Sequence, residues 1–298
     1  MNVKPLFELM VEKKASDLFF APYAPVKIKI DGKIMSVNKM ELSPKQVRQA
    51  AMEIMTEEQL EALARDLEID FALSETGLGR FRVNVFHQRG NLAMVLRYIT
   101  AEMPTLDDLG MPPILGDLIL NRRGLILMVG ATGSGKSTTI AAMINYRNIK
   151  TASHIITVED PIEFLHKNKK SIVNQRELGL DTRSYHNALR SALRAAPDLV
   201  MVGEIRDVET MQAAINIAGT GQLAIATLHS NNAPETLDRI INMFPVEQQK
   251  QVFIDLSQYL KAIISQRLVR NREGKRVAAV ELMLNTPHIA ELIEKGDI

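Results

Sequence analysis

The chain has 298 residues, of which 46% are hydrophobic and 24% are charged, and its formal net charge at pH 7 is +1. This length and composition are typical of one large globular domain or two smaller ones. The near-neutral charge gives no electrostatic case for a nucleic-acid partner, and none is expected. Because cysteine is absent, disulfides, thiolate zinc sites and cysteine nucleophiles are excluded. The chain has no apolar run of the ~18 residues that a membrane span needs and no signal-peptide pattern, so a soluble, cytoplasmic protein is predicted.

The first part of the chain, residues 1–100, has the pattern of an α+β domain. Apolar residues between positions 6 and 14 recur at helical spacing, and residues 26–30 alternate apolar and charged side chains as a half-buried strand does. Asp31-Gly32, directly after this strand, is a typical hairpin turn. The further predicted elements are helices that start at the capping residues Ser43 and Thr56, and strands at residues 81–85 and 92–99.

Residues 101–113 are rich in turn formers and acidic side chains, and they are predicted to be a linker. The pattern changes in the following segment, residues 114–298, where short apolar strands alternate with helical segments. The predicted strands lie at residues 125–129, 155–158, 199–202 and 223–227. This alternation indicates βαβ units and an α/β domain with a mostly parallel sheet.

Residues 130–137 match the pattern G-x-x-x-x-G-K-[ST], the phosphate-binding loop of nucleotide triphosphatases, between a predicted strand and a predicted helix. The glycines let backbone N–H groups curl around a polyphosphate, and the helix N-terminus adds a favourable dipole. Lys136 is expected to reach the β- and γ-phosphates, and the Ser137 hydroxyl to hold Mg²⁺. The residues expected to bind the nucleotide are Gly130, Ala131, Thr132, Gly133, Ser134, Gly135, Lys136, Ser137 and Thr138.

Three further segments follow predicted strands, at the sheet edge where ligands of α/β proteins bind. The first carries Glu159, Asp160 and Glu163, carboxylates that can hold metal-bound water or orient an attacking water; the alternative is a solvated acidic turn. The second is an apolar strand that delivers Glu204 towards Mg²⁺, in a place where aspartate is usual. The third carries His229, which is placed to hydrogen-bond the γ-phosphate, although a lone histidine is more often structural.

These four elements, in this order, resemble the secretion-superfamily hexameric ATPases, and within them the type IV pilus retraction ATPases of the PilT/PilU family. The residues that carry the resemblance are 158–164, 198–207 and 258–268, the last of which matches the family's long helix. The family's opening Ala15-Ser16-Asp17-Leu18 is present, but residues 19–22 stand where PilT-like chains commonly have a histidine. This difference places the chain closer to the PilU-like members.

The resemblance implies a PAS-like N-terminal domain followed by a RecA-like P-loop ATPase domain, in a ring of six identical subunits that binds ATP and Mg²⁺. In that arrangement Glu163 polarises the attacking water and Glu204 supports the metal beside Ser137. His229 couples the γ-phosphate to conformational change. Arg82 and Arg97 on adjacent predicted strands match arginines that complete the site from the N-terminal domain; the alternative is a pair of surface arginines.

The function implied by the resemblance is ATP-driven retraction of type IV pili, which powers twitching motility, at the cytoplasmic face of the inner membrane. The implied partner is the inner-membrane platform protein of the pilus. One alternative is an accessory ring that assists a paralogous retraction ATPase; another is an assembly ATPase for pilus extension or type II secretion, a group that commonly carries a four-cysteine zinc site. Family members usually continue beyond residues 294–298 with another helical segment, which is expected to be missing here.

Overall fold

The structure is a computed structural model that describes residues 2–99 and 103–297. The chain divides into two compact units, Met1–Ala101 and Glu102–Ile298, and each has its own hydrophobic core. Residues 1, 100–102 and 298 lie outside the described residues, and they include the start of the predicted linker.

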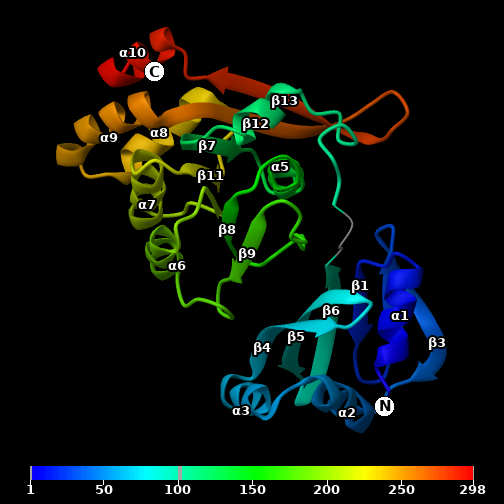
Figure 1. Ribbon diagram of the computed structural model, residues 1–298. Coiled ribbons are helices and arrows are strands. Elements are labelled where there is room, and N and C mark those ends of the chain that lie inside the picture. Colours follow the sequence, from blue (N-terminus) through cyan, green and yellow to red (C-terminus); the bar gives the residue numbers. More distant parts are fainter. Residues whose placement is uncertain (1, 100–102, 298) are drawn as a thin grey trace. The chain divides into compact units, whose positions relative to one another are not determined.

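The first unit combines helices with an antiparallel sheet, as the α+β pattern predicts (Figure 1). The strands follow the order β3-β2-β1-β6-β5-β4 across the sheet. The elements described in this unit are α1 (Lys4–Glu12), β1 (Asp17–Phe20), β2 (Pro25–Ile30), β3 (Lys33–Glu41), α2 (Pro44–Ile54), α3 (Glu57–Asp66), β4 (Glu68–Glu75), β5 (Gly79–Gln88) and β6 (Asn91–Ile99). Its core lies between the helices and one face of the sheet, with Phe7, Leu18 and Phe81 fully or almost fully buried.

Local sequence signals account for the turns and helix starts of this unit. Asp31 and Gly32 have φ angles of 48° and 79°, the left-handed pair that a tight hairpin between β2 and β3 needs. The side chains of Ser43 and Thr56 accept hydrogen bonds from the backbone N–H groups of Gln46 and Gln59. The side chains of these two glutamines accept in turn from the backbone N–H groups of Ser43 and Thr56, so both helices begin with a capping box. These predictions are confirmed.

The second unit is a sheet in the order β13-β12-β7-β11-β10-β8-β9, in which β13 pairs antiparallel and the other strands pair in parallel. This confirms the predicted α/β class with a mostly parallel sheet. The elements described in it are α4 (Ile114–Ile119), β7 (Gly124–Val129), α5 (Lys136–Lys150), β8 (His154–Glu159), β9 (Ile172–Glu177), α6 (Tyr185–Ala192), a 3₁₀ turn (Leu193–Ala195), β10 (Leu199–Val202), α7 (Val208–Gly219), β11 (Leu223–Leu228), α8 (Ala233–Met243), α9 (Val246–Tyr259), β12 (Leu260–Arg270), β13 (Arg276–Leu284) and α10 (Pro287–Lys295).

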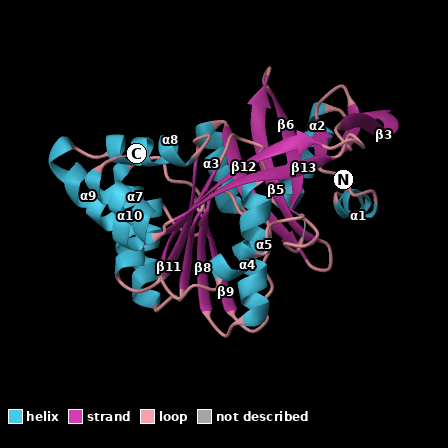
Figure 2. Ribbon diagram, turned by 90° about the horizontal axis from the view of Figure 1, so that it is seen from above, coloured by secondary structure: helices cyan, strands magenta, loops and turns pink. Residues whose placement is uncertain are grey.

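Helices cover both faces of this sheet, with α4 and α5 on one side and α7 and α9 on the other (Figure 2). Alternate residues of β7 show the division. Leu125 and Leu127 pack in the core with α6 to α9, whereas Ile126 and Met128 pack in the core with α4 and α5. A strand buried on both faces reads as a continuous apolar run, which is why β7 was recognisable in the sequence.

The long helix expected over residues 258–268 is wrong. Helix α9 ends at Tyr259, and Leu260–Arg270 forms β12, which pairs in parallel with β7 and antiparallel with β13. Residues 262–264 are buried inside the sheet. A short apolar run is ambiguous between a buried helix and a buried strand, and here pairing with β7 decides the outcome. The consequence for the site is that β12 runs beside the strand that carries the phosphate loop.

Part of the predicted linker has a fixed place in the second unit. Leu106 and Met111 are only 6% and 7% exposed, and they pack in the same core as Ile126 and Met128. Asp108 accepts hydrogen bonds from the backbone and hydroxyl groups of Thr105, which fixes the turn between them. Leu106 and Met111 therefore anchor residues 103–113 to the core of the second unit.

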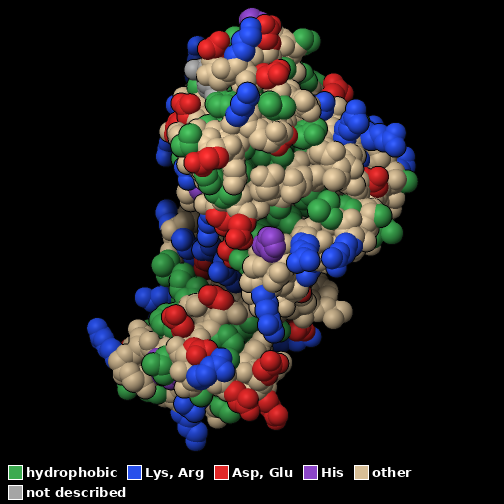
Figure 3. Space-filling model, turned by 90° about the vertical axis from the view of Figure 1, so that its left-hand side faces the viewer, with side chains coloured by type: hydrophobic (Ala, Val, Ile, Leu, Met, Phe, Trp, Pro, Cys, Tyr) green, Lys and Arg blue, Asp and Glu red, His purple; other side chains and the backbone are tan. Residues whose placement is uncertain are grey.

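The surface carries charges of both signs. On the face shown in Figure 3, acidic side chains are interspersed with lysine and arginine side chains. Across the described parts of the chain, no helix combines the length and apolar character required to cross a bilayer.

Candidate active site

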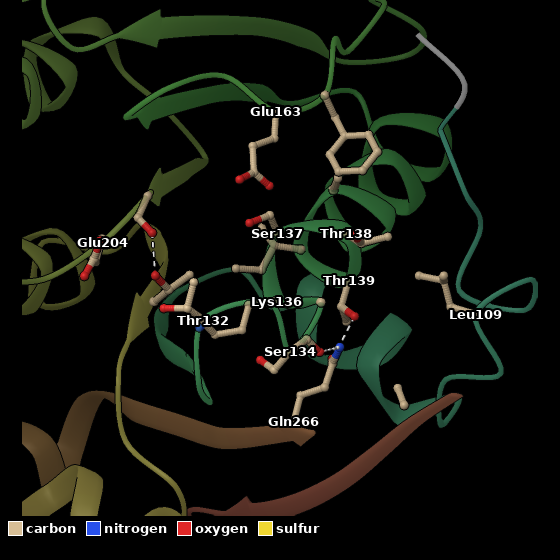
Figure 4. Close-up of a pocket in the computed structure, with 18 of the residues that line it drawn as sticks. Leu109, Thr132, Ser134, Lys136, Ser137, Thr138, Thr139, Glu163, Glu204 and Gln266 are labelled. Carbon is tan, nitrogen blue, oxygen red and sulfur yellow. Dashed lines mark hydrogen bonds between the residues drawn. The ribbon is translucent and has the colours of Figure 1, made fainter. Parts of the chain in front are cut away.

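A cavity of about 980 Å³ opens in the second unit beside the carboxyl ends of β7, β8, β10 and β11 (Figure 4). The cavity is lined by loop residues 132–135, the start of α5 and the segment after β8, together with Glu204, His229, and residues of β12 and β13. The four segments that the sequence singled out therefore meet in one place. This is the sheet edge where α/β proteins bind ligands.

Glycine is required in the phosphate loop by backbone angle and by space. Gly130 and Gly135 have φ angles of 145° and 87°, which side chains rarely adopt. A Cβ atom at Gly130 would lie 2.4 Å from the carbonyl oxygen of Gln266, and one at Gly135 would lie 2.8 Å from the Gln266 side-chain nitrogen. Both glycines therefore allow β12 to pack directly against the loop.

Gln266 on β12 is a site residue that the sequence reasoning missed. Its side chain is 1% exposed; Nε2 donates to the carbonyl of Ser134 at 2.8 Å, and Oε1 accepts from the hydroxyl of Thr139 at 2.8 Å. Figure 4 shows it reaching the loop and the first turn of α5 at once. The signal in the sequence is a single amide side chain within an apolar run. The prediction of a helix for this segment gave no reason to place Gln266 beside the phosphate loop.

The loop fits a polyphosphate anion. The Lys136 Nζ donates to the carbonyls of Gly130 and Ala131 at 2.6 and 3.0 Å, inside the curl of the loop. Burial lowers the pKa of Lys136, and the charges of Glu204 and Glu163 oppose that change. The buried Ser134 hydroxyl has no hydrogen-bond partner within the described part of the chain. A buried polar atom in such a cradle is suited to a phosphate oxygen.

Glu204 lies between Arg206 and His229. Its carboxylate oxygens are 2.6 Å from the Arg206 guanidinium and 3.0 Å from the Nε2 of His229. Burial by itself raises the pKa of Glu204, but the hydrogen bond and charge of Arg206, with His229 and Lys136, lower it overall. The structure thus brings Glu204 and His229 together at the cavity, where Glu204 carries a negative charge suited to Mg²⁺ or its bound water.

The three carboxylates after β8 differ in their surroundings. Asp160 and Glu163 are exposed, whereas Glu159 is 9% exposed and its Oε1 accepts from the Thr157 hydroxyl at 2.6 Å. Figure 4 shows the Glu163 carboxylate facing the Ser137 hydroxyl across the cavity. Within residues 2–99 and 103–297, no group of three or more His, Asp or Glu side chains is arranged to hold a metal by itself. A magnesium ion here would depend on Ser137 and on the phosphates for most of its ligands.

Arg82 and Arg97 lie in the first unit, directly opposite each other on β5 and β6. Arg97 Nε is 2.9 Å from the carboxylate of buried Asp17, and Arg82 Nε is 3.8 Å from that of Asp70. Like charges opposite each other repel, and these carboxylates offset the repulsion. The Arg97 side chain is 65% exposed. Whether the two arginines reach a phosphate loop stays a prediction.

The comparisons with known proteins agree with the site. The sequence pattern described as "Type II/IV secretion system protein" matches residues 2–293. The chain is 50% identical to the type IV pilus ATPase PilU of Pseudomonas aeruginosa, covering 100% of this chain and 78% of PilU. It is 42% identical to PilT of the same organism, named as a type IV pilus retraction ATPase, covering 100% of this chain and 87% of PilT.

A crystal structure of the pilus retraction motor PilT with bound ADP superposes with a TM-score of 0.95 at 45% identity, covering 100% of this chain and 87% of that one. The higher identity to PilU than to PilT of the same organism agrees with the PilU-like N-terminus. The chain belongs to the type II/IV secretion system protein family, as an ATPase of its PilT/PilU group.

Proposed function

We propose that the protein is a hexameric motor that hydrolyses ATP with Mg²⁺ and powers the retraction of type IV pili, and hence twitching motility. The observation that carries this proposal is the position of Glu163 opposite Ser137 at the phosphate loop (Figure 4). A carboxylate on that side of a bound γ-phosphate can polarise the attacking water. Apolar side chains of Leu109, Leu268 and Ala278 line the same cavity and suit the nucleotide base.

The remaining side chains have distinct tasks in this proposal. Lys136 and the backbone N–H groups of the loop hold the phosphates, and the N-terminus of α5 adds its dipole. Ser137 would hold Mg²⁺, which neutralises charge that develops on the transferred phosphoryl group. Glu204, oriented by Arg206 and paired with His229, would hold metal-bound water. Because His229 directly follows β11 and contacts Glu204, it would link the phosphate side of the cavity to that strand.

Each nucleotide site would be completed by residues of a neighbouring subunit. Arg82 and Arg97 would supply positive charge to the phosphates of a neighbouring subunit in a six-membered ring, at the cytoplasmic face of the inner membrane. Hydrolysis would then move the two units as rigid bodies and turn the pilus platform protein. Two inactive variants, Lys136→Ala and Arg97→Ala, test the shared site. Mixing them should restore part of the activity if the arginine acts in trans, and none if it acts within its own subunit.

The identity to PilU favours a second candidate function, in which the ring assists a paralogous retraction ATPase. Pilus retraction in cells that contain this ATPase and lack its paralogue distinguishes the two functions. Retraction forces and rates near those of cells with both proteins support the primary motor. Loss of retraction, with ATP hydrolysis by the purified protein intact, supports the assisting ring.

A further inference from the structure

The segment that carries Glu163 connects β8 to β9, and side chains of β9 hold it in place. Gln175 and Glu177 are two residues apart on this strand, so both point to the same face of the sheet. Gln175 does not line the nucleotide cavity, whereas residues 159–161, 163, 164 and 166 do. Any influence of Gln175 on a bound nucleotide must therefore pass through this segment.

The amide of Gln175 bonds to the segment at three points. Its Nε2 donates to the Glu159 carboxylate at 3.0 Å and to the carbonyl of Phe164 at 2.8 Å, and its Oε1 accepts from the backbone N–H of His166 at 2.8 Å. Both hydrogens of the amide nitrogen and the carbonyl oxygen are thus engaged. One side chain thus ties Glu159, at the end of β8, to residues 164–166 of the segment.

Two carboxylates help to hold the segment. The buried Glu159 carboxylate accepts from the Thr157 hydroxyl and from Gln175. The Glu177 carboxylate accepts from the backbone N–H of Ile162 at 3.2 Å. The backbone is therefore held immediately before and immediately after Glu163, while the Glu163 side chain itself is exposed and faces Ser137 (Figure 4).

We propose that Gln175 and Glu159 are positioning residues that hold the Glu163 carboxylate at the distance from the phosphate loop that water activation requires. The inference rests on the proposed function, because it assumes that Glu163 polarises the attacking water. It assigns Glu159 to the support of the segment instead of to Mg²⁺ or its water. Misplacing a reacting group by about 1 Å costs about 100-fold in rate, so three lost hydrogen bonds are enough to matter.

The test replaces Gln175 with leucine, which has a similar size and forms none of the three hydrogen bonds. The matched control is Gln249→Leu on α9, because Gln249 is also half-buried and donates to a backbone carbonyl, that of Phe244, but does not line the cavity. The steady-state rate of phosphate release should fall about 10- to 100-fold in Gln175→Leu, with the KM for ATP changed less than about twofold. The control should keep the wild-type kcat.

A double variant separates positioning from loss of fold. If Gln175 acts through Glu163, adding Gln175→Leu to Glu163→Gln should lower the residual rate no further, because the group being positioned is already gone. A multiplicative loss in the double variant, or a raised KM with an unchanged kcat, would overturn the inference. Gln175→Glu serves as the second variant: it keeps the size, removes both N–H donors and places a carboxylate against Glu159.

Hydrogen exchange of the backbone amides of residues 162–166 gives a readout that does not depend on hydrolysis. The His166 amide should exchange at least about 10-fold faster in Gln175→Leu than in the wild type and the Gln249→Leu control, since it loses its acceptor, the Oε1 of Gln175. Equal exchange would overturn the inference even in an active enzyme. A wild-type protein that binds ATP but does not hydrolyse it would refute the proposed function, and the exchange comparison would still decide whether Gln175 fixes the segment.

Discussion

Replacing Gln266 with leucine should weaken nucleotide binding, although Gln266 lies more than a hundred residues from the phosphate loop in sequence. The substitution leaves the buried Ser134 carbonyl and Thr139 hydroxyl without the partners they have at 2.8 Å. An unsatisfied buried polar group costs about 1–3 kcal/mol, so the two together cost about 2–6 kcal/mol. Part of this cost falls on the loop conformation that binds phosphate, and the rest on global stability.

The loss of nucleotide affinity depends on how much of this free-energy cost falls on the phosphate-binding conformation of the loop. If the phosphate-binding conformation loses about 1.4–2.8 kcal/mol relative to alternatives, the dissociation constant rises about 10- to 100-fold. Isothermal titration with Mg-ATP and with Mg-tripolyphosphate measures this change, and both ligands should weaken equally because the loop contacts phosphates only. A dissociation constant within about twofold of the wild-type value in a folded Gln266→Leu protein would show that Gln266 does not support the phosphate-binding conformation of the loop.

Three further predictions follow from the site. Gly130→Ala should abolish nucleotide binding in titration, because its Cβ would lie 2.4 Å from the Gln266 carbonyl oxygen; an alanine variant with wild-type affinity would contradict the packing described. Arg206→Ala should raise the pKa of Glu204, because burial then dominates, and should move the acidic limb of the kcat/KM profile to higher pH. An unchanged limb would show that the acidic limb does not report the ionisation of Glu204. Burial lowers the pKa of His166 from 6.5 to about 4, so the unfolded chain takes up this proton first as the pH falls. The associated stability is complete above pH 6.5 and is lost towards pH 4, and urea unfolding should show a loss of about 2 kcal/mol between pH 7 and pH 5 that His166→Gln lacks.

Features encoded in short stretches of sequence were predictable. The hairpin at Asp31-Gly32, the capping boxes at Ser43 and Thr56 and the phosphate loop each depend on residues within a few positions of one another. The alternation of apolar strands and helices was enough to place the acidic segments and His229 at one edge of a parallel sheet, because that edge follows from topology.

Features that depend on contacts between distant segments were not predictable. Gln266 and Gln175 act through partners supplied by other elements, 127–132 residues away for Gln266, and neither belongs to a recognisable motif. The helix predicted at residues 258–268 is wrong because it too depended on a distant contact. An apolar run can form a helix or a strand, and here pairing with β7, which the run itself does not reveal, makes it a strand. Glu159 and Glu163 look alike in sequence, and their burial and the hydrogen bonds of Glu159 distinguish them.

The most direct test of the proposed motor is Mg²⁺-dependent phosphate release from the purified protein beside its Glu163→Gln variant, with the mass in solution recorded under the same conditions. Glutamine keeps the size of the side chain but cannot accept the proton of the attacking water. We expect a hexamer that releases phosphate, and a variant that assembles and binds ATP equally well but loses at least about 100-fold in rate. A variant as active as the wild type would contradict the role given to Glu163 and with it the proposed mechanism.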